Sequence, residues 1–492
     1  MSLISRLGLG ACLAVALVLS IALSLSLTSR THASGGALTQ LSSDPYTNTT
    51  SQHKTEVEPD NFASGSTIVN AFQVGRFTDG GSSNTGWATS NDNGTTWQHG
   101  FLPGTTVFAK PKGIYARISD PAVAYDAKDK VWMISGLSIL IESGSPIGAA
   151  VLVNRSTDGG LTWSNPVTVA KAPIGVFFDK DWIVCDDTST SPFFGHCYAE
   201  WDIASSGDLV QMSTSTDGGK TWGPAQATAN KASGLGGQPL VQPGGTVIVP
   251  FVGANIESFT STNGGTSWTA SVTIGSAKSH TEGGNLRSSP LPSAEIDASG
   301  KVYVAWQNCQ FEKGCSANDI VVSTSTNGTT WSAAQRVPID PVGSGVDHFI
   351  PGIGLDKSTS GNNAHIGLVY YYYPLSNCTV STCQLDVGFV SSTNGGKSWS
   401  ASTQLAGPMH IKWLAATTGG FMVGDYFSTS FANGNAFPVF AIATAPHGTV
   451  FNEAMFTVTG GIPVTGGSLT SAGSQVIDSS LQPARAVSLT AY

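Results

Sequence analysis

An eight-residue pattern that recurs six times constrains the fold of this chain more than any other feature. The copies begin at Ser90, Ser156, Ser215, Ser261, Ser325 and Ser392. Each runs from serine through Asp or Asn and Gly to a closing tryptophan, and the copy at Ser325 is one residue shorter than the others. Successive copies start 46 to 67 residues apart. That is the length of one antiparallel sheet with its loops, so the chain is predicted to consist of similar small sheets.

The residues of the pattern suit a tight turn between two strands. Asp or Asn accepts hydrogen bonds from backbone N–H groups further along the turn, and Gly adopts positive φ without strain. Apolar or β-branched runs flank the turns, such as 149–153 before the second copy and 167–169 after it. We expect the third residue of each copy to have a structural role: Asp92, Asp158, Asp217, Asn263, Asn327 and Asn394.

A second pattern between the copies predicts the remaining strands. Apolar runs occur in pairs separated by a short turn, for example 120–126 with 131–134 and 292–297 with 302–306. Counting a first unit from Ile68 and a last unit at 421–440 that lacks the repeated turn gives seven units of about four strands. A ring of such sheets is a β-propeller. We predict an all-β propeller with seven blades, or six if the two terminal units share one sheet.

The repeated turns resemble the Asp-box, or BNR, repeat of the sialidase-like β-propeller superfamily. The segments 179–182, 286–292 and 424–426 are similar to those of bacterial secreted proteins described as sialidase-like. The resemblance covers nearly all of residues 58–444. It implies Asp-box hairpins between the outer strands, on the rim and away from the active mouth.

The two ends of the chain differ from the repeat region, which is predicted to form a single propeller over 56–460. Leu7 to Leu27 form an apolar run behind Arg6, so residues 1–33 are expected to be a signal peptide or an uncleaved membrane anchor. Residues 34–55 are rich in Ser, Thr and Gly and predict a flexible stalk, which is either disordered or contributes an edge strand. The polar tail 461–492 is expected to be disordered or to add an edge strand.

Composition and cysteine spacing agree with a protein outside the cytoplasm, either secreted or anchored to the outer face of the membrane. Apart from Cys12, the six cysteines form sequence-near pairs, and we expect three disulfides: Cys185 with Cys197, Cys309 with Cys315, and Cys378 with Cys383. No CxxC or HxxxH spacing accompanies them, so no metal is predicted. The net charge of -9 and the absence of a basic stretch argue against nucleic-acid binding. No cofactor is expected, and the membrane is contacted only through an uncleaved N-terminal segment.

Chemistry in a propeller concentrates where loops enter the inner strands, because those loops converge on the central channel. The polar residues at these places are Glu58, Arg117, Asp120, Asp179, Lys180, Asp181, Gln238, Arg287, Asp347, His348, Lys412, Asp425 and Tyr426. From this set we select as catalytic candidates Asp120, Asp181, Asp347 and Tyr426. The candidates for substrate binding are Arg117, Arg287 and His348. Carboxylates that share a funnel can divide acid and base roles.

The family resemblance implies a clamp of three arginines on a substrate carboxylate, the first in an Arg-Ile-Pro motif, with an aspartate acid/base and a tyrosine nucleophile paired with a glutamate. Here the segment 117–119 reads Arg-Ile-Ser, and Arg287 is a second clamp candidate. A third is not evident, since Arg76 is placed within a strand or its turn and Arg155 and Arg336 adjoin repeated turns.

Two functions follow as hypotheses. The first is an exported sialidase-like propeller that acts on extracellular glycans or glycoproteins as a glycoside hydrolase of the exo-sialidase type, with an incomplete arginine triad. The alternative is a non-catalytic cell-surface propeller that binds glycan or protein, with the aromatic run 370–373 as a contact surface. In both, the protein is expected to be a monomer. Fold alone does not choose between them.

Overall fold

The computed structural model describes residues 36–470 of the 492-residue chain. The predicted signal peptide or anchor at 1–33 and the tail beyond residue 470 lie outside the described residues. Within 36–470 the structure is all-β, with short 3-10 turns and no α-helix. None of the helical turns in this part of the chain has the length and apolar character needed to cross a bilayer.

Antiparallel strands form successive groups of about four in chain order. The first group is β2 (Glu56–Ser64), β3 (Thr67–Arg76), β4 (Ser82–Ser90) and β5 (Gln98–Phe101). The second is β6 (Arg117–Asp126), β7 (Val131–Glu142), β8 (Ser145–Ser156) and β9 (Val167–Lys171). A pairing of Ser82 with Ile118 joins these two groups into one sheet. The third is β10 (Asp179–Cys185), β11 (Cys197–Ile203), β12 (Leu209–Ser215) and β13 (Gln226–Ala227).

The same order continues through the rest of the chain. The fourth group is β14 (Leu240–Val241), β15 (Val247–Val252), β16 (Ile256–Ser261) and β17 (Val272–Gly275). The fifth is β18 (Ser293–Ile296), β19 (Val302–Asn308), β20 (Asp319–Ser325) and β21 (Gln335–Arg336). The sixth is β22 (Asp347–Leu355), β23 (Ile366–Tyr373), β24 (Gln384–Ser392) and β25 (Thr403–His410). A separate hairpin of β26 (Ala415–Thr417) and β27 (Gly420–Met422) follows.

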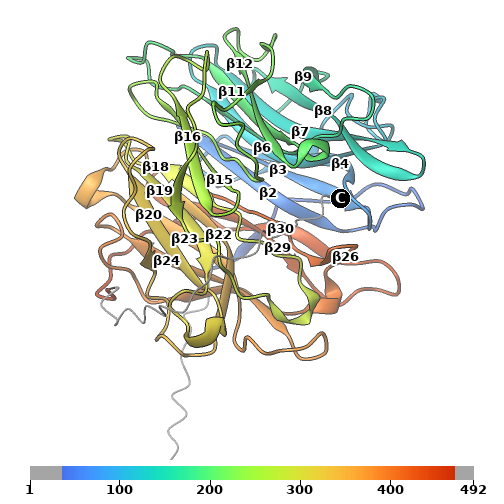
Figure 1. Ribbon diagram of the computed structural model, residues 1–492. Helices are drawn as coiled ribbons and strands as arrows, with labels where there is room; N and C mark the ends of the chain where they lie inside the picture. Colours follow the sequence, from blue (N-terminus) through green and yellow to red (C-terminus); the bar gives the residue numbers. More distant parts are fainter. Residues whose placement is uncertain (1–35, 471–492) are drawn as a thin grey trace, which may run out of the picture. The chain divides into compact units, whose positions relative to one another are not determined.

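The last group closes the fold with strands from both ends of the described chain. It contains β28 (Thr429–Ala432), β29 (Asn435–Ala443), β30 (Glu453–Val458) and β1 (Leu38–Gln40), with β31 (Ile462–Pro463) paired to β29. The inner strands β2, β6, β10, β14, β18, β22 and β28 contact one another in this order, and β28 contacts β2. Figure 1 shows the early strand β2 beside the late strands β29 and β30. The fold is therefore a β-propeller.

Residues 36–55 contribute an edge strand, one of the two outcomes expected for them, and do not form a flexible stalk. β1 pairs with β30 in register, from Leu38 opposite Val458 to Gln40 opposite Phe456. Leu41 is fully buried, and the Ser42 hydroxyl donates to Glu56 at 2.7 Å. Backbone pairing with an open sheet edge and one buried leucine hold a segment whose polar composition alone gives no such signal. The start of the tail adds the short strand β31, one of the two outcomes expected for it.

The repeated turns connect the third and fourth strands of their sheets. In the second copy, Asp158 Oδ1 accepts from the backbone N–H groups of Leu161 at 3.1 Å and Thr162 at 2.9 Å. Ser156 Oγ accepts from the N–H of Gly160 at 3.0 Å. Hydrogen bonds from Thr96, through its side chain and its backbone N–H, lower the pKa of the equivalent Asp92 to about 2. The turn carboxylates are thus occupied by their own backbone.

All three expected disulfides are present. They join Cys185 to Cys197, Cys309 to Cys315 and Cys378 to Cys383. The first links the paired strands β10 and β11, and the other two close short loops of the fifth and sixth groups. Disulfides persist in oxidising compartments, which agrees with a place outside the cytoplasm.

Candidate functional site

Four inner strands are interrupted by a β-bulge at the same level. The bulges in β2, β6, β10 and β22 contain Glu58, Asp120, Lys180 and Ile350. These four residues have positive φ, of 54°, 51°, 25° and 47° respectively. Left-handed conformations are costly for residues with a Cβ, and both they and bulges concentrate at functional sites, where they re-aim side chains. Two of the four, Asp120 and Lys180, line an adjoining cavity.

A cavity of about 380 Å³ opens beside these bulges. Its charged lining residues are Arg76, Asp120, Asp179, Lys180, Glu282, Arg287 and Asp425. Apolar side chains from the β7–β8 hairpin and the loop before β10 line the remainder, among them Ile139, Ile147 and Phe177. The cavity, called the funnel cavity below, thus combines carboxylates and cations with an apolar wall.

The cavity is crossed by an ion pair between Arg287, in the loop before β18, and Asp425, in the segment before β28. Arg287 Nε lies 2.9 Å from Oδ1 and 3.1 Å from Oδ2 of Asp425, and Nη2 also donates to Oδ2. Burial by itself raises the pKa of Asp425, but the charge and hydrogen bonds of Arg287, together with Arg76, outweigh it and hold the pKa below its usual value. Asp425 is therefore ionised.

Arg76, at the end of β3, is the second guanidinium of the cavity and is almost completely buried. Its Nη1 donates to the carbonyl of Gly81 at 3.0 Å, whereas its Nε has no hydrogen-bond partner within the described residues. The Gln73 amide beside it donates to Glu58 and, at 3.0 Å, to Ser119 Oγ. Burial raises the pKa of Glu58 to about 8, and the charges of Asp120 and Asp425 add to the shift.

Asp179, at the first position of β10, is a carboxyl group of the cavity that can hold a proton near neutral pH. Burial raises its pKa to about 7, with a further contribution from the charge of Asp120. The backbone N–H of Lys180 and the charge of Arg287 oppose the shift without cancelling it. One cavity therefore contains an ionised carboxylate, Asp425, and a carboxyl group whose pKa lies near 7.

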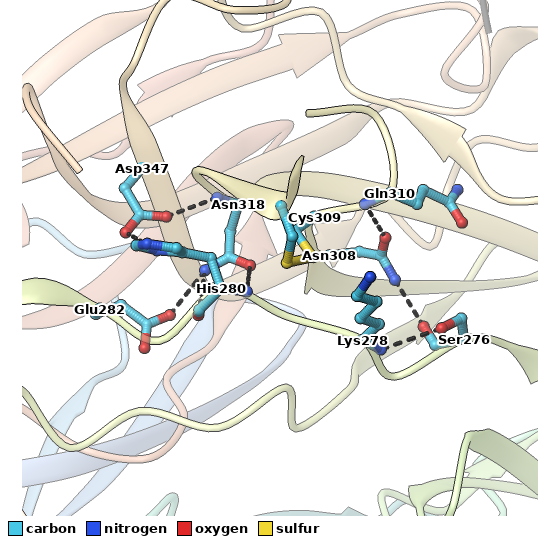
Figure 2. The surroundings of a disulfide bond; sticks show 10 residues. Ser276, Lys278, His280, Glu282, Asn308, Cys309, Gln310, Asn318 and Asp347 are labelled. Atoms are coloured by element: carbon cyan, nitrogen blue, oxygen red, sulfur yellow. Dashed lines mark hydrogen bonds and ion pairs between the residues drawn. A yellow bond between two sulfur atoms is a disulfide. The ribbon is translucent and has the colours of Figure 1, made fainter. Parts of the chain in front are cut away.

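A hydrogen-bond network holds the loop that carries Arg287 and Glu282 (Figure 2). Asp347, the first residue of β22, accepts from the backbone N–H of Asn318 at 2.6 Å and lies 3.0 Å from His280 Nδ1. The Asn318 side chain bonds the backbone of His280 in both directions and donates to Glu282 Oε1 at 3.0 Å. Asp347, a catalytic candidate from sequence, thus lies behind the loop and does not line the cavity.

Of the seven candidates selected from sequence, the funnel cavity brings together two, Asp120 and Arg287. Arg117 lies behind its wall: Nη1 donates to Asp79 at 2.6 Å and to the Gly80 carbonyl at 2.8 Å. Its guanidinium also lies 4.0 Å above the Phe77 ring. Arg117 adjoins the cavity, but its N–H donors form hydrogen bonds with the β3–β4 turn.

The other candidates are buried away from the cavity. Asp181 is fully buried, and Tyr426 Oη donates to the Pro121 carbonyl at 3.0 Å while Lys180 Nζ lies 3.9 Å above its ring. His348 is buried between Asn318 and the ring of Tyr372. The bulge in β10 explains why Asp181 does not reach the cavity. It shifts the alternation of side chains along the strand, so Asp179 has access to the cavity in place of Asp181.

Arg76 was not among the candidates selected from the sequence, although this residue lines the cavity. Its position at the very end of β3, before the turn that contains Gly80 and Gly81, indicates that its side chain can reach the mouth of the cavity. The sequence also contains an indication of the bulges themselves. A proline follows three of the four bulge residues, Glu58, Asp120 and Ile350. A proline within a strand pattern marks an edge or a bulge.

One group of side chains has the composition of a metal site, but an arginine neutralises it. Ligand atoms of Asp319, Asp340 and His348 lie within 4.8 Å of one another. Arg336 donates to Asp319 Oδ1 at 2.7 Å and to Asp340 Oδ1 at 2.6 Å. Since the guanidinium already supplies the positive charge between the two carboxylates, we assign no metal to this group.

No family model and no curated protein matches this chain. Among solved structures, a protein of unknown function from Dyadobacter fermentans aligns with a TM-score of 0.45 and 16% identity over 73% of this chain and 99% of that chain. An ulvan lyase, described as a new family of polysaccharide lyase, gives 0.48 and 11% over 87% and 96%. A Hadza microbial sialidase gives 0.41 and 11% over 82% and 65%. Roles for this chain are inferred below from its own residues.

Proposed function

We propose that this protein is an exported glycoside hydrolase whose funnel cavity binds and cleaves a glycan that bears an acidic sugar. The observation that carries the proposal is the pairing, in one cavity, of Asp179, whose pKa is raised to about 7, with Asp425, whose pKa is held low by Arg287. Carboxyl groups whose environments separate their pKa values in this way can divide acid and base work.

The two arginines are the proposed contacts for the acidic group of the substrate. Both guanidinium groups line the cavity, and Nη1 of Arg287 makes no hydrogen bond within the described residues. Guanidinium groups recognise carboxylates through paired N–H donors. This arrangement supplies two of the three arginines that a sialidase-type clamp needs, with Arg117 held back by Asp79.

In the proposed reaction, Asp179 donates its proton to the glycosidic oxygen as the bond from that oxygen to the sugar carbon breaks. Asp425, as a carboxylate, accepts a proton from the water whose oxygen forms the new bond to carbon. Turnover then requires protonated Asp179, so the rate should fall as pH rises through about 7.

The test is a hydrolysis screen of the purified protein on methylumbelliferyl glycosides of N-acetylneuraminic and glucuronic acid. Asp179→Asn should lower kcat by about 10²- to 10⁴-fold, which is the usual contribution of a general acid. Asp181→Asn, two residues away and buried, is the matched control and should leave kcat close to wild type. Equal losses in both variants would contradict the assignment of Asp179.

Binding without cleavage would favour the second function, a non-catalytic propeller that holds a glycan at the cell surface. The four consecutive tyrosines of β23 do not supply its contact surface, because all of them are buried. Its ligand would occupy the funnel cavity, and Arg287→Ala would weaken binding while Asp179→Asn would not.

A further inference from the structure

A second cleft lies between the fifth and sixth sheets and shares no lining residue with the funnel cavity. Its volume is about 400 Å³. One side is formed by the start of β19 with β20 and β21, and the other by the repeated turn between β24 and β25. This volume falls in the range of small-ligand sites.

The cleft is basic, although the chain as a whole carries a net charge of -9. Lys301 is half-buried, Lys397 is exposed, and neither forms an ion pair within the described residues. Burial lowers the pKa of Lys301, and the charge of Lys397 adds to the shift although Asp297 opposes it. The carboxylate of Asp297 is itself occupied by backbone N–H groups of Ser299, Lys301 and Gly361. Two ammonium groups therefore share the cleft without a dedicated counter-charge.

A buried hydroxyl at the base of the cleft also lacks a partner. Tyr303 is completely buried, and its Oη makes no hydrogen bond within the described residues. Lys301 Nζ lies 4.8 Å above its ring. The turn residue Gly395 packs close to this hydroxyl, since a Cβ at that position would lie 3.3 Å from Tyr303 Oη. The hydroxyl is closed off in the free protein, so Tyr303 contributes its ring to the cleft beneath Lys301.

We propose that this cleft binds a sugar unit carrying a sulfate or carboxylate group, as part of an acidic polysaccharide. The anionic group would lie between Lys301 and Lys397, and Ser332, Thr324 and Gln335 supply polar groups for sugar hydroxyls. The cleft is larger than a free inorganic anion requires, which favours a sugar as the ligand. This site goes beyond the funnel chemistry and does not depend on turnover.

The repeat architecture provides a matched control. Lys220 occupies the same position in its repeated turn as Lys397, and Lys130 precedes β7 as Lys301 precedes β19. At that equivalent place, Asp129 approaches Gly218 of the repeated turn and supplies a negative charge. Removing Lys130 and Lys220 therefore changes the net charge equally without changing the cleft.

The experiment measures binding of chondroitin sulfate fragments by calorimetry at low salt, in an Arg287→Ala background that removes binding in the funnel cavity. The double variant Lys301→Ala/Lys397→Ala should weaken binding about 100-fold, a factor of about ten for each charged contact. Lys130→Ala/Lys220→Ala should bind like the background protein. Tyr303→Phe should bind like the background protein at an unchanged or higher Tm, because the buried hydroxyl has no hydrogen-bond partner within the described residues and does not face the ligand.

Three results would overturn the proposal. The first is unchanged affinity in Lys301→Ala/Lys397→Ala. The second is an equal loss in the Lys130/Lys220 control, which would reduce the effect to net charge. The third is binding of inorganic sulfate as tight as that of the polysaccharide, which would make the cleft a site for a free anion only.

Discussion

Arg287 and Asp425 are 138 positions apart in the chain and meet across the funnel cavity, with Arg287 Nε 2.9 Å from Asp425 Oδ1. The pair joins the loop before the fifth sheet to the segment before the last one. Both side chains are largely buried, with 26% and 15% exposed. Charge pairs in such surroundings are screened less by solvent than surface pairs.

A double-mutant cycle on this pair should give a clear coupling energy. Arg287→Ala and Asp425→Ala each leave a partly buried charge without its partner, so we expect a coupling of about 0.5–3 kcal/mol in the free energy of unfolding. Urea denaturation measures it. The pair Arg117–Asp79, in which Asp79 is 42% exposed, is the control and should couple by about 0.2–1 kcal/mol. A smaller coupling for Arg287–Asp425 than for this control would contradict the description of the cavity.

The free energy of unfolding should decrease as the pH rises from acidic to neutral and alkaline values. Glu200 and Asp202 are completely buried, and neither carboxyl group has a hydrogen-bond partner within the described residues. Burial raises the pKa of both well above the usual value, and raises that of Glu56 and Glu282 to about 8. A group whose folded pKa is raised binds more protons in the folded state, so its contribution is complete below the unfolded pKa and is lost as pH rises towards the folded one.

The urea midpoint should therefore fall between about pH 4 and pH 8, and Glu200→Gln should flatten that dependence. Asp158→Asn is a control in which the substituted carboxyl group has a lowered pKa instead of a raised one. Hydrogen bonds from Thr162 and Ser156 outweigh burial and lower the pKa of Asp158 to about 2. Its contribution is present above the unfolded pKa and is lost only in strong acid, so this variant should change the acid side alone. A midpoint that rises from pH 4 to pH 8 would refute the burial of uncharged carboxyl groups.

The tryptophans that close the repeated turns should differ in their contribution to stability. Trp268 is 4% exposed and packs edge-on against Tyr198 and Phe259, whereas Trp163 is only half-buried. We expect Trp268→Ala to cost about 3–5 kcal/mol, the usual range for a buried Trp, and Trp163→Ala to cost less. Thermal unfolding compares the two variants. Equal losses would indicate that the turn itself, and not packing between sheets, sets the contribution.

Each disulfide should add about 2–3 kcal/mol to stability, because the loops it closes are short. Peptide mapping without reduction should recover the pairs Cys185–Cys197, Cys309–Cys315 and Cys378–Cys383. Cys378→Ser/Cys383→Ser has an additional expected effect, since the Cys378 carbonyl and Cys383 Sγ lie against Gly283 and Gly284 in the loop that carries Arg287. This variant should weaken ligand binding in the funnel cavity, whereas Cys185→Ser/Cys197→Ser should not.

Local patterns in the sequence were sufficient for the repeated units of this protein. The turn pattern, the strand pairs and the cysteine spacing predicted a ring of antiparallel sheets and the three disulfides, because a tight turn, period-two alternation and short loop closure depend on residues close in sequence. The edge strand β1 was one of the two outcomes expected for residues 34–55, but its partner strand was not predicted. Its pairing with β30 is set by an open sheet edge more than 400 residues away, and nothing within 36–55 encodes that edge.

The candidate site shows the same division between local and distant information. The sequence indicated that polar residues gather before the inner strands, and Asp120 and Arg287 were selected on that ground. It did not distinguish Asp179 from Asp181 or bring Arg76 into the cavity, because one bulge residue reverses which side chain of a strand faces the channel. Burial and charge in the assembled ring then fix the pKa values of Asp179 and Asp425. Those quantities depend on neighbours from different sheets, so the tertiary structure alone determines them.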